Sequence, residues 1–177
     1  MNRATRSRPA SFSIEEFVAQ AVMMEIEASE RYAELADTME VHNSPEVAAL
    51  FRKLSVVERL HADRMMADMG WSQLPELAIG DFGWNGFDAP EMAPIDSVHY
   101  LMRPYHVLQI ALANEKRAEQ FFGALAEAAA NDAVRRAALK LQAEEREHIA
   151  WIRESLEHTP RPEPDWNVDP DPPRFVD

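Results

Sequence analysis

The stretch from Glu58 to His61 reads Glu-Arg-Leu-His, and the stretch from Glu145 to His148 reads Glu-Arg-Glu-His. Positions three residues apart lie on one face of an α-helix, so the two side chains of each pair can reach the same point in space. Apolar residues flank both pairs at spacings of three and four, which is typical of a helix face packed into a core. The pattern therefore predicts two helices that each carry an acid and an imidazole on a buried face.

Two further stretches carry a single Glu in the middle of an otherwise apolar helical stripe, at Glu25 and at Glu115. A buried carboxylate without a partner is costly or stays protonated, and four that converge in one core would also repel one another. Two divalent cations would cancel four carboxylates, and two neutral imidazoles would complete the ligand sets. Carboxylate and imidazole ligands suit iron or manganese, and zinc less distinctively. We therefore expect a two-metal site held by six side chains: Glu25, Glu58, His61, Glu115, Glu145 and His148.

Local signals divide the chain into four helices, predicted over residues 13–40, 44–69, 96–130 and 131–158. Ser13 and Glu16 form a capping-box pair at the start of the first helix. Pro45 suits the first turn of the second helix, where its missing N–H leaves no hydrogen bond unmade. Pro104 falls inside the third helix, so it should kink that helix or delay its regular part.

The connection over residues 71–95 is rich in Gly, Pro and aromatic residues, and we expect it to be a long, ordered crossover. Two helical hairpins joined by such a crossover are typical of a ferritin-like four-helix bundle, so the predicted fold class is all-α. We assign this bundle to residues 12–158. Residues 1–11 are predicted to form a disordered basic tail, and residues 159–177 an extended Pro-rich tail.

Composition narrows the classes of function. The formal net charge of −13 disfavours binding to nucleic acid, which needs clustered Lys and Arg. No apolar run reaches the roughly 20 residues of a membrane-spanning helix, and the basic N-terminus lacks the apolar region of a secretory signal. The chain has no Cys, which excludes disulfides, thiolate metal sites and iron–sulfur centres. We expect a cytoplasmic protein, and the apolar residues of the crossover favour a homodimer.

The two halves of the chain repeat one layout, a Glu seven residues before an aromatic residue and then a Glu-x-x-His. The first half has Glu25 and Tyr32, and the second half has Glu115 and Phe122. In this layout the chain resembles the rubrerythrin-like branch of the ferritin-like family over residues 13–157. The resemblance implies a di-iron centre with the six residues above as ligands. It also implies that the Tyr32 hydroxyl hydrogen-bonds to a ligand carboxylate; the alternative for Tyr32 is an aromatic ring that only fills the core.

Neighbouring residues leave some assignments open. Glu144 lies four residues before His148 and is the alternative to Glu145 as the partner of that imidazole. His99 and His106 lie near the start of the third helix, roughly two turns or more before its buried Glu. We expect those two histidines to bind no metal.

One position departs from the family. Rubrerythrins typically carry a second ligand Glu on the third helix, three residues after the first, and here that position is Ala118. Glu119 follows, but it would sit a turn further along the helix axis. We therefore predict a near-symmetric six-ligand site in which Glu119 is not a ligand and His61 matches His148.

The resemblance also implies redox chemistry, in which two iron ions per chain cycle between ferrous and ferric states and reduce hydrogen peroxide or dioxygen. Many rubrerythrins carry an additional rubredoxin-like iron site on four Cys. Because this chain has no Cys, we expect a separate electron-donor protein. Three alternatives stay open: iron binding or storage without catalysis, a metal that only neutralises the core, and another ferritin-like enzyme such as a manganese catalase or a hydroxylase.

Overall fold

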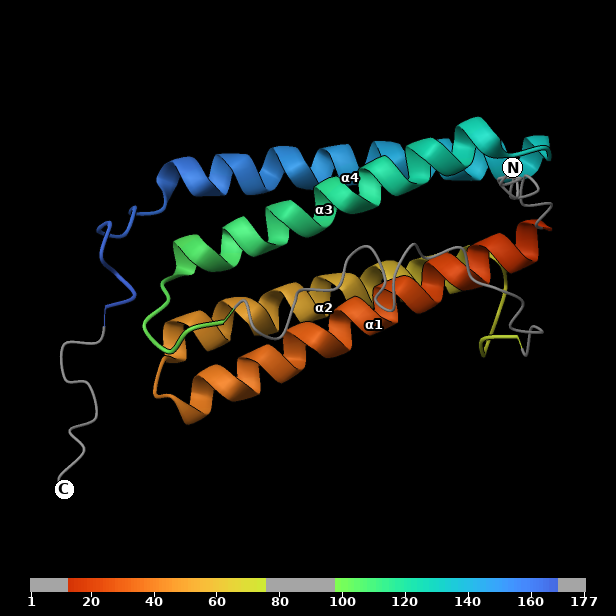
Figure 1. The fold of residues 1–177 in the computed structure, drawn as a ribbon. Coiled ribbons are helices and arrows are strands. Elements are labelled where there is room, and N and C mark those ends of the chain that lie inside the picture. Colours follow the sequence, from red (N-terminus) through yellow and green to blue (C-terminus); the bar gives the residue numbers. More distant parts are fainter. Residues whose placement is uncertain (1–12, 76–97, 169–177) are drawn as a thin grey trace, which may run out of the picture.

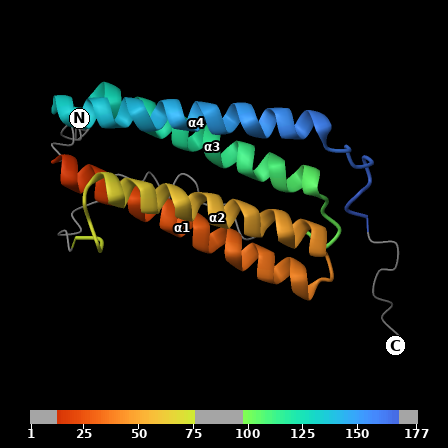
Figure 2. The same cartoon turned by 180° about the vertical axis from the view of Figure 1, so that it is seen from behind.

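A computed structural model describes residues 13–75 and 98–168 of the chain. Over these residues it contains four α-helices, α1 (Ile14–Val41), α2 (Pro45–Asp68), α3 (Pro104–Ala128) and α4 (Asp132–His158), and no β-strand. α1 pairs with α2 in one hairpin and α3 with α4 in a second, and the two hairpins lie face to face (Figure 1; Figure 2 shows the same layers from behind). The predicted all-α, ferritin-like fold class is confirmed. Among the helices of these two ranges, none combines the length and apolar character that crossing a bilayer requires.

The ends of the helices explain the connectivity. α2 and α3 run in the same direction, so the end of α2 and the start of α3 lie at opposite ends of the bundle (Figure 1). Most of the predicted crossover, from residue 76 onward, lies outside the described residues, as do the predicted N-terminal tail and residues 169–177.

The predicted helix starts agree with the structure, except in α3. The side chain of Ser13 accepts a hydrogen bond from the Glu16 N–H at 3.1 Å, and the Ser13 N–H donates to Glu16 Oε2 at 2.8 Å, which completes the capping box. The prediction that the third helix begins near residue 96 is wrong, because α3 begins at Pro104. A proline ring fits the first turn of a helix but clashes with the preceding turn in its interior, so Pro104 delays the helix instead of kinking it.

The core consists of two apolar clusters with the buried acids between them. The first cluster includes Tyr32, Phe51, Val107 and Ile152, and the second includes Phe17, Met24, Phe122, Ala138 and Leu141. On α1, α3 and α4 one cluster ends and the other begins near the middle of the helix, and on α2 the partly buried Met65 packs against the second cluster. A buried Glu lies near the middle of each helix: Glu25, Glu58, Glu115 or Glu145. The fold therefore brings one carboxylate from each helix to the centre of the bundle.

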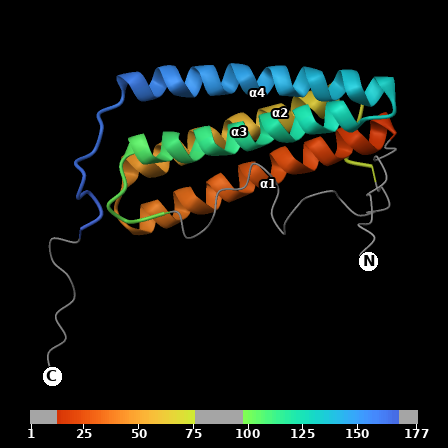
Figure 3. The ribbon, with the colours of Figure 1, turned by 45° about the horizontal axis from the view of Figure 1, so that its top comes forward.

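The described part of the C-terminal tail folds back on the bundle. Residues 164–167 form a turn instead of the predicted extended chain. The Trp166 ring lies 3.8 Å from the His106 ring of α3, measured between ring centroids. The segment after α4 therefore covers the end of the bundle at which α3 begins (Figure 3).

Candidate metal centre

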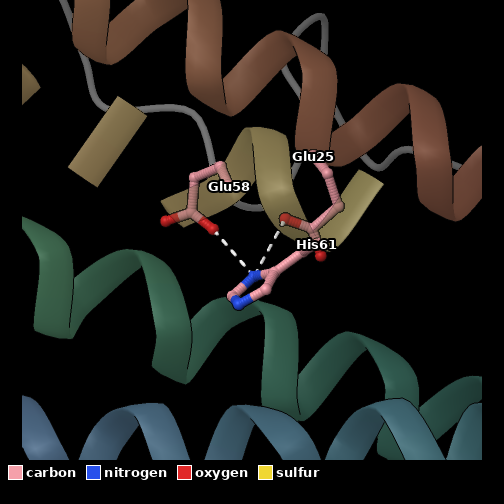
Figure 4. A group of neighbouring side chains, drawn as sticks. All are labelled: Glu25, Glu58 and His61. Atoms are coloured by element: carbon pink, nitrogen blue, oxygen red, sulfur yellow. Dashed lines mark ion pairs between the residues drawn. The ribbon is translucent and has the colours of Figure 1, made fainter. Parts of the chain in front are cut away.

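The first hairpin brings together Glu25 from α1 and Glu58 and His61 from α2. One ligand atom from each of these residues lies within 4.8 Å of the others. His61 Nδ1 is 3.3 Å from Glu58 Oε2 and 3.8 Å from Glu25 Oε2, and both carboxylates point at the imidazole (Figure 4). The i, i+3 spacing of the Glu-x-x-His motif on α2 produces this convergence, as its sequence predicts.

The second hairpin repeats the arrangement with Glu115 from α3 and Glu145 and His148 from α4. His148 Nδ1 lies 3.3 Å from Glu115 Oε2 and 3.2 Å from Glu145 Oε2. Each hairpin thus supplies two buried carboxylates and one half-buried imidazole.

The two groups of three face each other across the bundle. The rings of His61 and His148 stack with their centroids 4.5 Å apart and their planes 4° from parallel. The charge of Glu145 also acts on Glu25, which belongs to the other hairpin. The structure therefore brings the six predicted residues into one centre with an approximate twofold arrangement. That they bind metal stays a prediction.

The residues present fit a pair of cations. Glu25 Oε2 and His61 Nδ1 are buried, and neither has a hydrogen-bond partner in the described part of the chain. Buried polar atoms are normally paired, because an unmade hydrogen bond costs about 1–3 kcal/mol. A buried carboxylate oxygen and a buried imidazole nitrogen that lie 3.8 Å apart without a hydrogen bond are suited to share a metal ion.

The pKa values of the buried acids also indicate a site for positive charge. Burial raises the pKa of Glu25 to about 8; the contact with His61 lowers it in part, and the charges of Glu58 and Glu145 raise it. Burial likewise raises the pKa of Glu115 to about 7. Without a cation, these two carboxyl groups therefore hold protons at a pH where an exposed Glu has lost its own.

The imidazoles respond to the same carboxylates. Burial lowers the pKa of His61, but its contacts with Glu25 and Glu58 outweigh that effect and raise the pKa to about 9. Burial also lowers the pKa of His148, but its contacts with Glu115 and Glu145 outweigh that effect and raise the pKa to about 11. In the metal-free protein, bound protons therefore supply the positive charge that the four acids need.

These shifts predict how the metal-free protein responds to pH. The pKa of Glu25 is about 8 in the folded state against 4.5 in an unfolded chain, and that of His61 is about 9 against 6.5. The folded state therefore binds more protons than the unfolded state over this range, so the free energy of unfolding should fall as the pH rises from about 5 to about 9. Urea denaturation at a series of pH values, followed by circular dichroism, measures it.

The matched control for this pH dependence is the variant Glu25→Gln/Glu115→Gln, in which two of the four acids cannot ionise. Its free energy of unfolding should change less over the same pH range. A metal-free wild type whose stability rises between pH 5 and pH 9 would show that the carboxylates do not converge.

Glu144 and Glu119, the two other acids near the centre, make contacts outside the two groups of candidate ligands. The Glu144 side chain is one-third exposed, and its Oε1 lies 3.7 Å from Lys140 Nζ. Glu119 Oε1 accepts hydrogen bonds from Gln142 Nε2 and Arg146 Nε, each at 2.9 Å. An arginine and an amide therefore engage the Glu119 carboxylate, and that Glu119 is not a ligand stays a prediction.

The two histidines near the start of α3 take part in other contacts. His106 Nδ1 accepts a hydrogen bond from the Arg103 N–H at 2.9 Å, and its ring packs on Trp166. His99 Nδ1 accepts from the Leu101 N–H at 3.1 Å. Neither belongs to the two groups of candidate ligands among the described residues. That the two histidines bind no metal stays a prediction.

Tyr32 is 1% exposed, and its ring stacks on Phe51 with the centroids 6.1 Å apart. Its hydroxyl oxygen accepts a hydrogen bond from Asn114 Nδ2 at 2.8 Å. Asn114 is not among the residues predicted from the sequence, although its spacing gives a signal: it is a polar residue three after Ala111 and four before Ala118, both fully buried. That Tyr32 hydrogen-bonds to a ligand carboxylate stays a prediction.

A family model and solved structures are similar to this chain. A family model described as Rubrerythrin matches residues 16–74, which include α1, α2 and the first group of three candidate ligands. The crystal structure of an uncharacterized conserved protein from Magnetospirillum magnetotacticum is 36% identical in sequence, with a TM-score of 0.60, covering 86% of this chain and 99% of that one. A Rhodobacter capsulatus bacterioferritin, described with a metal-free dinuclear site and a haem iron, is 18% identical with a TM-score of 0.48, covering 84% and 88%. No functionally curated protein matches this chain.

Proposed function

This chain belongs to the rubrerythrin type of the ferritin-like family, and we propose that it is a di-iron oxidoreductase that reduces hydrogen peroxide or dioxygen. The observation that carries the proposal is the pair of Glu, Glu, His groups that face each other at the centre of one bundle. Three residues of each hairpin would hold one ion. Four carboxylates would then balance two divalent cations, and oxygen and nitrogen ligands of this kind suit iron.

The surroundings of the centre support chemistry on a small oxidant. The side chains of the four acids are at most 7% exposed, so the core keeps bulk water and large molecules away from them. The side chains of His61 and His148 are 15% and 26% exposed, so the centre meets solvent at the edge of the stacked imidazoles. A molecule of the size of peroxide or dioxygen can approach there.

The reduction of one hydrogen peroxide molecule breaks its O–O bond, consumes two electrons and two protons, and releases two water molecules. A bound pair of ferrous ions would supply both electrons. Returning the pair to its ferrous state requires two electrons from outside. The chain has no Cys and hence no thiolate iron site of its own, so we propose a separate electron-donor protein as its partner.

The proposal predicts that peroxide oxidises the bound iron in a fixed ratio. Anaerobic protein loaded with ferrous iron should give a ferric spectrum after about one equivalent of hydrogen peroxide per pair of ions, because each peroxide takes two electrons. Stopped-flow absorbance spectroscopy measures both the ratio and the rate. The variant Glu144→Ala, which alters an acid beside the centre but outside the two groups, should behave as the wild type.

Other outcomes would replace the proposal with a different function. A ferrous pair that does not react with stoichiometric peroxide or dioxygen excludes the redox role. A large cage that takes up many iron ions per chain indicates storage. Protein that retains only redox-inert zinc after purification without chelators indicates a metal that stabilises the bundle.

A further inference from the structure

A buried hydrogen bond joins the two hairpins beside the metal centre. Asn114 on α3 and Tyr32 on α1 are 2% and 1% exposed, and Asn114 Nδ2 donates to the Tyr32 hydroxyl at 2.8 Å. Asn114 directly precedes the candidate ligand Glu115 in the sequence. Burying a side-chain amide costs free energy unless its oxygen and its N–H groups find hydrogen-bond partners in the core.

A third residue determines which way the amide points. Arg117 donates to Asn114 Oδ1 through one of its terminal guanidinium nitrogens. An arginine has donors only, so the amide oxygen must face Arg117 and the amide nitrogen must face Tyr32. The hydroxyl oxygen of Tyr32 is therefore an acceptor in this bond. Its single proton takes no part in this bond and can only donate to a different acceptor.

The position of Tyr32 on α1 brings that proton toward the metal centre. Glu25, Ala28 and Tyr32 follow one another on one stripe at spacings of three and four, and all three are buried. Aromatic side chains on a helix lean toward its N-terminus, so the Tyr32 ring extends over the small Ala28 toward the level of Glu25. Glu25 is the residue of this stripe that carries a carboxylate.

The two residues related to Tyr32 and Asn114 by the pseudo-twofold are both apolar. Phe122 lies seven residues after Glu115, as Tyr32 does after Glu25, and Ala118 occupies the intermediate position. The residue that corresponds to Asn114 is Met24, which precedes Glu25. Phe122 and Met24 are 1% and 0% exposed, so the pair that corresponds to Tyr32 and Asn114 is buried and apolar. The ligands repeat with the pseudo-twofold, whereas the hydroxyl occurs on one side only.

We propose that Asn114, held by Arg117, is a positioning residue that fixes the Tyr32 hydroxyl as a hydrogen-bond donor toward the metal centre. The donor makes the two sides of the centre different: one oxygen of a bound oxidant, or one ligand carboxylate, can receive a hydrogen bond that its counterpart lacks. A donor held ready in a dry core stabilises negative charge as it develops on an oxygen atom. The role in the reaction rests on the proposed function, whereas the orientation of the hydroxyl does not.

The variant Asn114→Asp tests the orientation in metal-free protein. Aspartate keeps the size of Asn and the contact with Arg117, but an ionised carboxylate can only accept. Tyr32 must then donate to residue 114, and the hydrogen bond is reversed. The intensity ratio of the tyrosine Fermi doublet in Raman spectra distinguishes a phenol that donates from one that accepts, so we expect the ratio to fall in this variant. An unchanged ratio would overturn the proposal.

Two further variants assign the spectral change to Tyr32 and to the orientation of the Asn114 amide. Tyr32→Phe removes the contribution of Tyr32, so adding Asn114→Asp to it should change nothing more; a further change would assign the signal to another tyrosine and count against the proposal. Arg117→Met frees the amide to rotate without placing a new charge in the core. It should move the ratio in the same direction by a smaller amount, which keeps the test decisive if the aspartate variant does not fold.

Iron-loaded protein tests the role in the reaction. Asn114→Asp and Tyr32→Phe should each slow the oxidation of the ferrous pair by peroxide by at least about tenfold, with iron content unchanged. The double variant should be no slower than either single one, because both remove the same donor. Wild-type rates in both variants would overturn the positioning role. If peroxide does not oxidise the wild-type iron, the proposed function fails, while the Raman comparison still decides how Asn114 orients Tyr32.

Discussion

Replacing Glu145 with Ala is expected to abolish tight binding of both metal ions. Two divalent ions in one centre repel each other, and four carboxylates are needed to balance them. The variant leaves three carboxylates against two divalent ions in a core where charge is poorly screened. Glu58→Ala should have the same effect from the other hairpin, because the two groups of three face each other across the stacked histidines.

The expected loss is at least about a hundredfold in affinity for each ion, which exceeds the effect of removing a group that only supports a ligand. Isothermal titration with ferrous iron under argon, followed by metal analysis of the desalted protein, measures it. Glu144→Ala is the matched control and should keep both ions, since Glu144 lies near Lys140 at 3.7 Å. His61→Ala should be milder and affect one ion more than the other. Full loading of the Glu145→Ala variant would contradict this assignment.

Metal binding is also expected to raise the melting temperature by roughly 15–30 °C. An ion present at a thousandfold excess over its dissociation constant stabilises the folded state by about 4 kcal/mol, and each kcal/mol corresponds to about 2–4 °C in a domain of this size. Two ions therefore stabilise the bundle by about 8 kcal/mol. The physical source is the set of four buried carboxylates, together with the unpaired Glu25 Oε2 and His61 Nδ1.

Calorimetry of the protein with and without ferrous iron at pH 7 measures this shift. The double variant Glu58→Ala/Glu145→Ala provides the control, because it should melt at one temperature whether or not the metal is added. Wild-type protein with equal melting temperatures in the two states would mean that the four acids do not form a cation site.

The sequence predicts most helix ends because the signals there are local. Ser13 and Glu16 form their capping box from neighbouring residues alone, and α4 begins one residue after Asn131, whose side chain accepts from the Ala133 N–H at 2.8 Å. The start of α3 was predicted too early, since the choice between a kink and a delayed start at Pro104 depends on packing at the end of the bundle. The turn of the C-terminal tail around Trp166 likewise depends on contacts with α3 that no local pattern encodes.

The candidate site is predictable to the level of helix faces. Spacings of three and four place Glu25 and Glu115 among apolar residues, and each Glu-x-x-His motif brings two ligands together within one helix. Spacing along one helix does not predict the contacts between helices. The bond from Asn114 to Tyr32 depends on which side chains of α1 and α3 meet, and on a proton direction that Arg117 determines from outside the core. Periodicity identifies a buried face but not its partners across the bundle.

Anomalous diffraction from crystals soaked in iron, recorded on either side of the iron absorption edge, tests the central claim most directly. Two ions should lie side by side at the centre of the bundle. One should be within bonding distance of Glu25, Glu58 and His61, and the other within bonding distance of Glu115, Glu145 and His148. A single ion, or ions bound at other residues such as Glu119 while His61 stays free, would contradict the symmetric six-ligand centre.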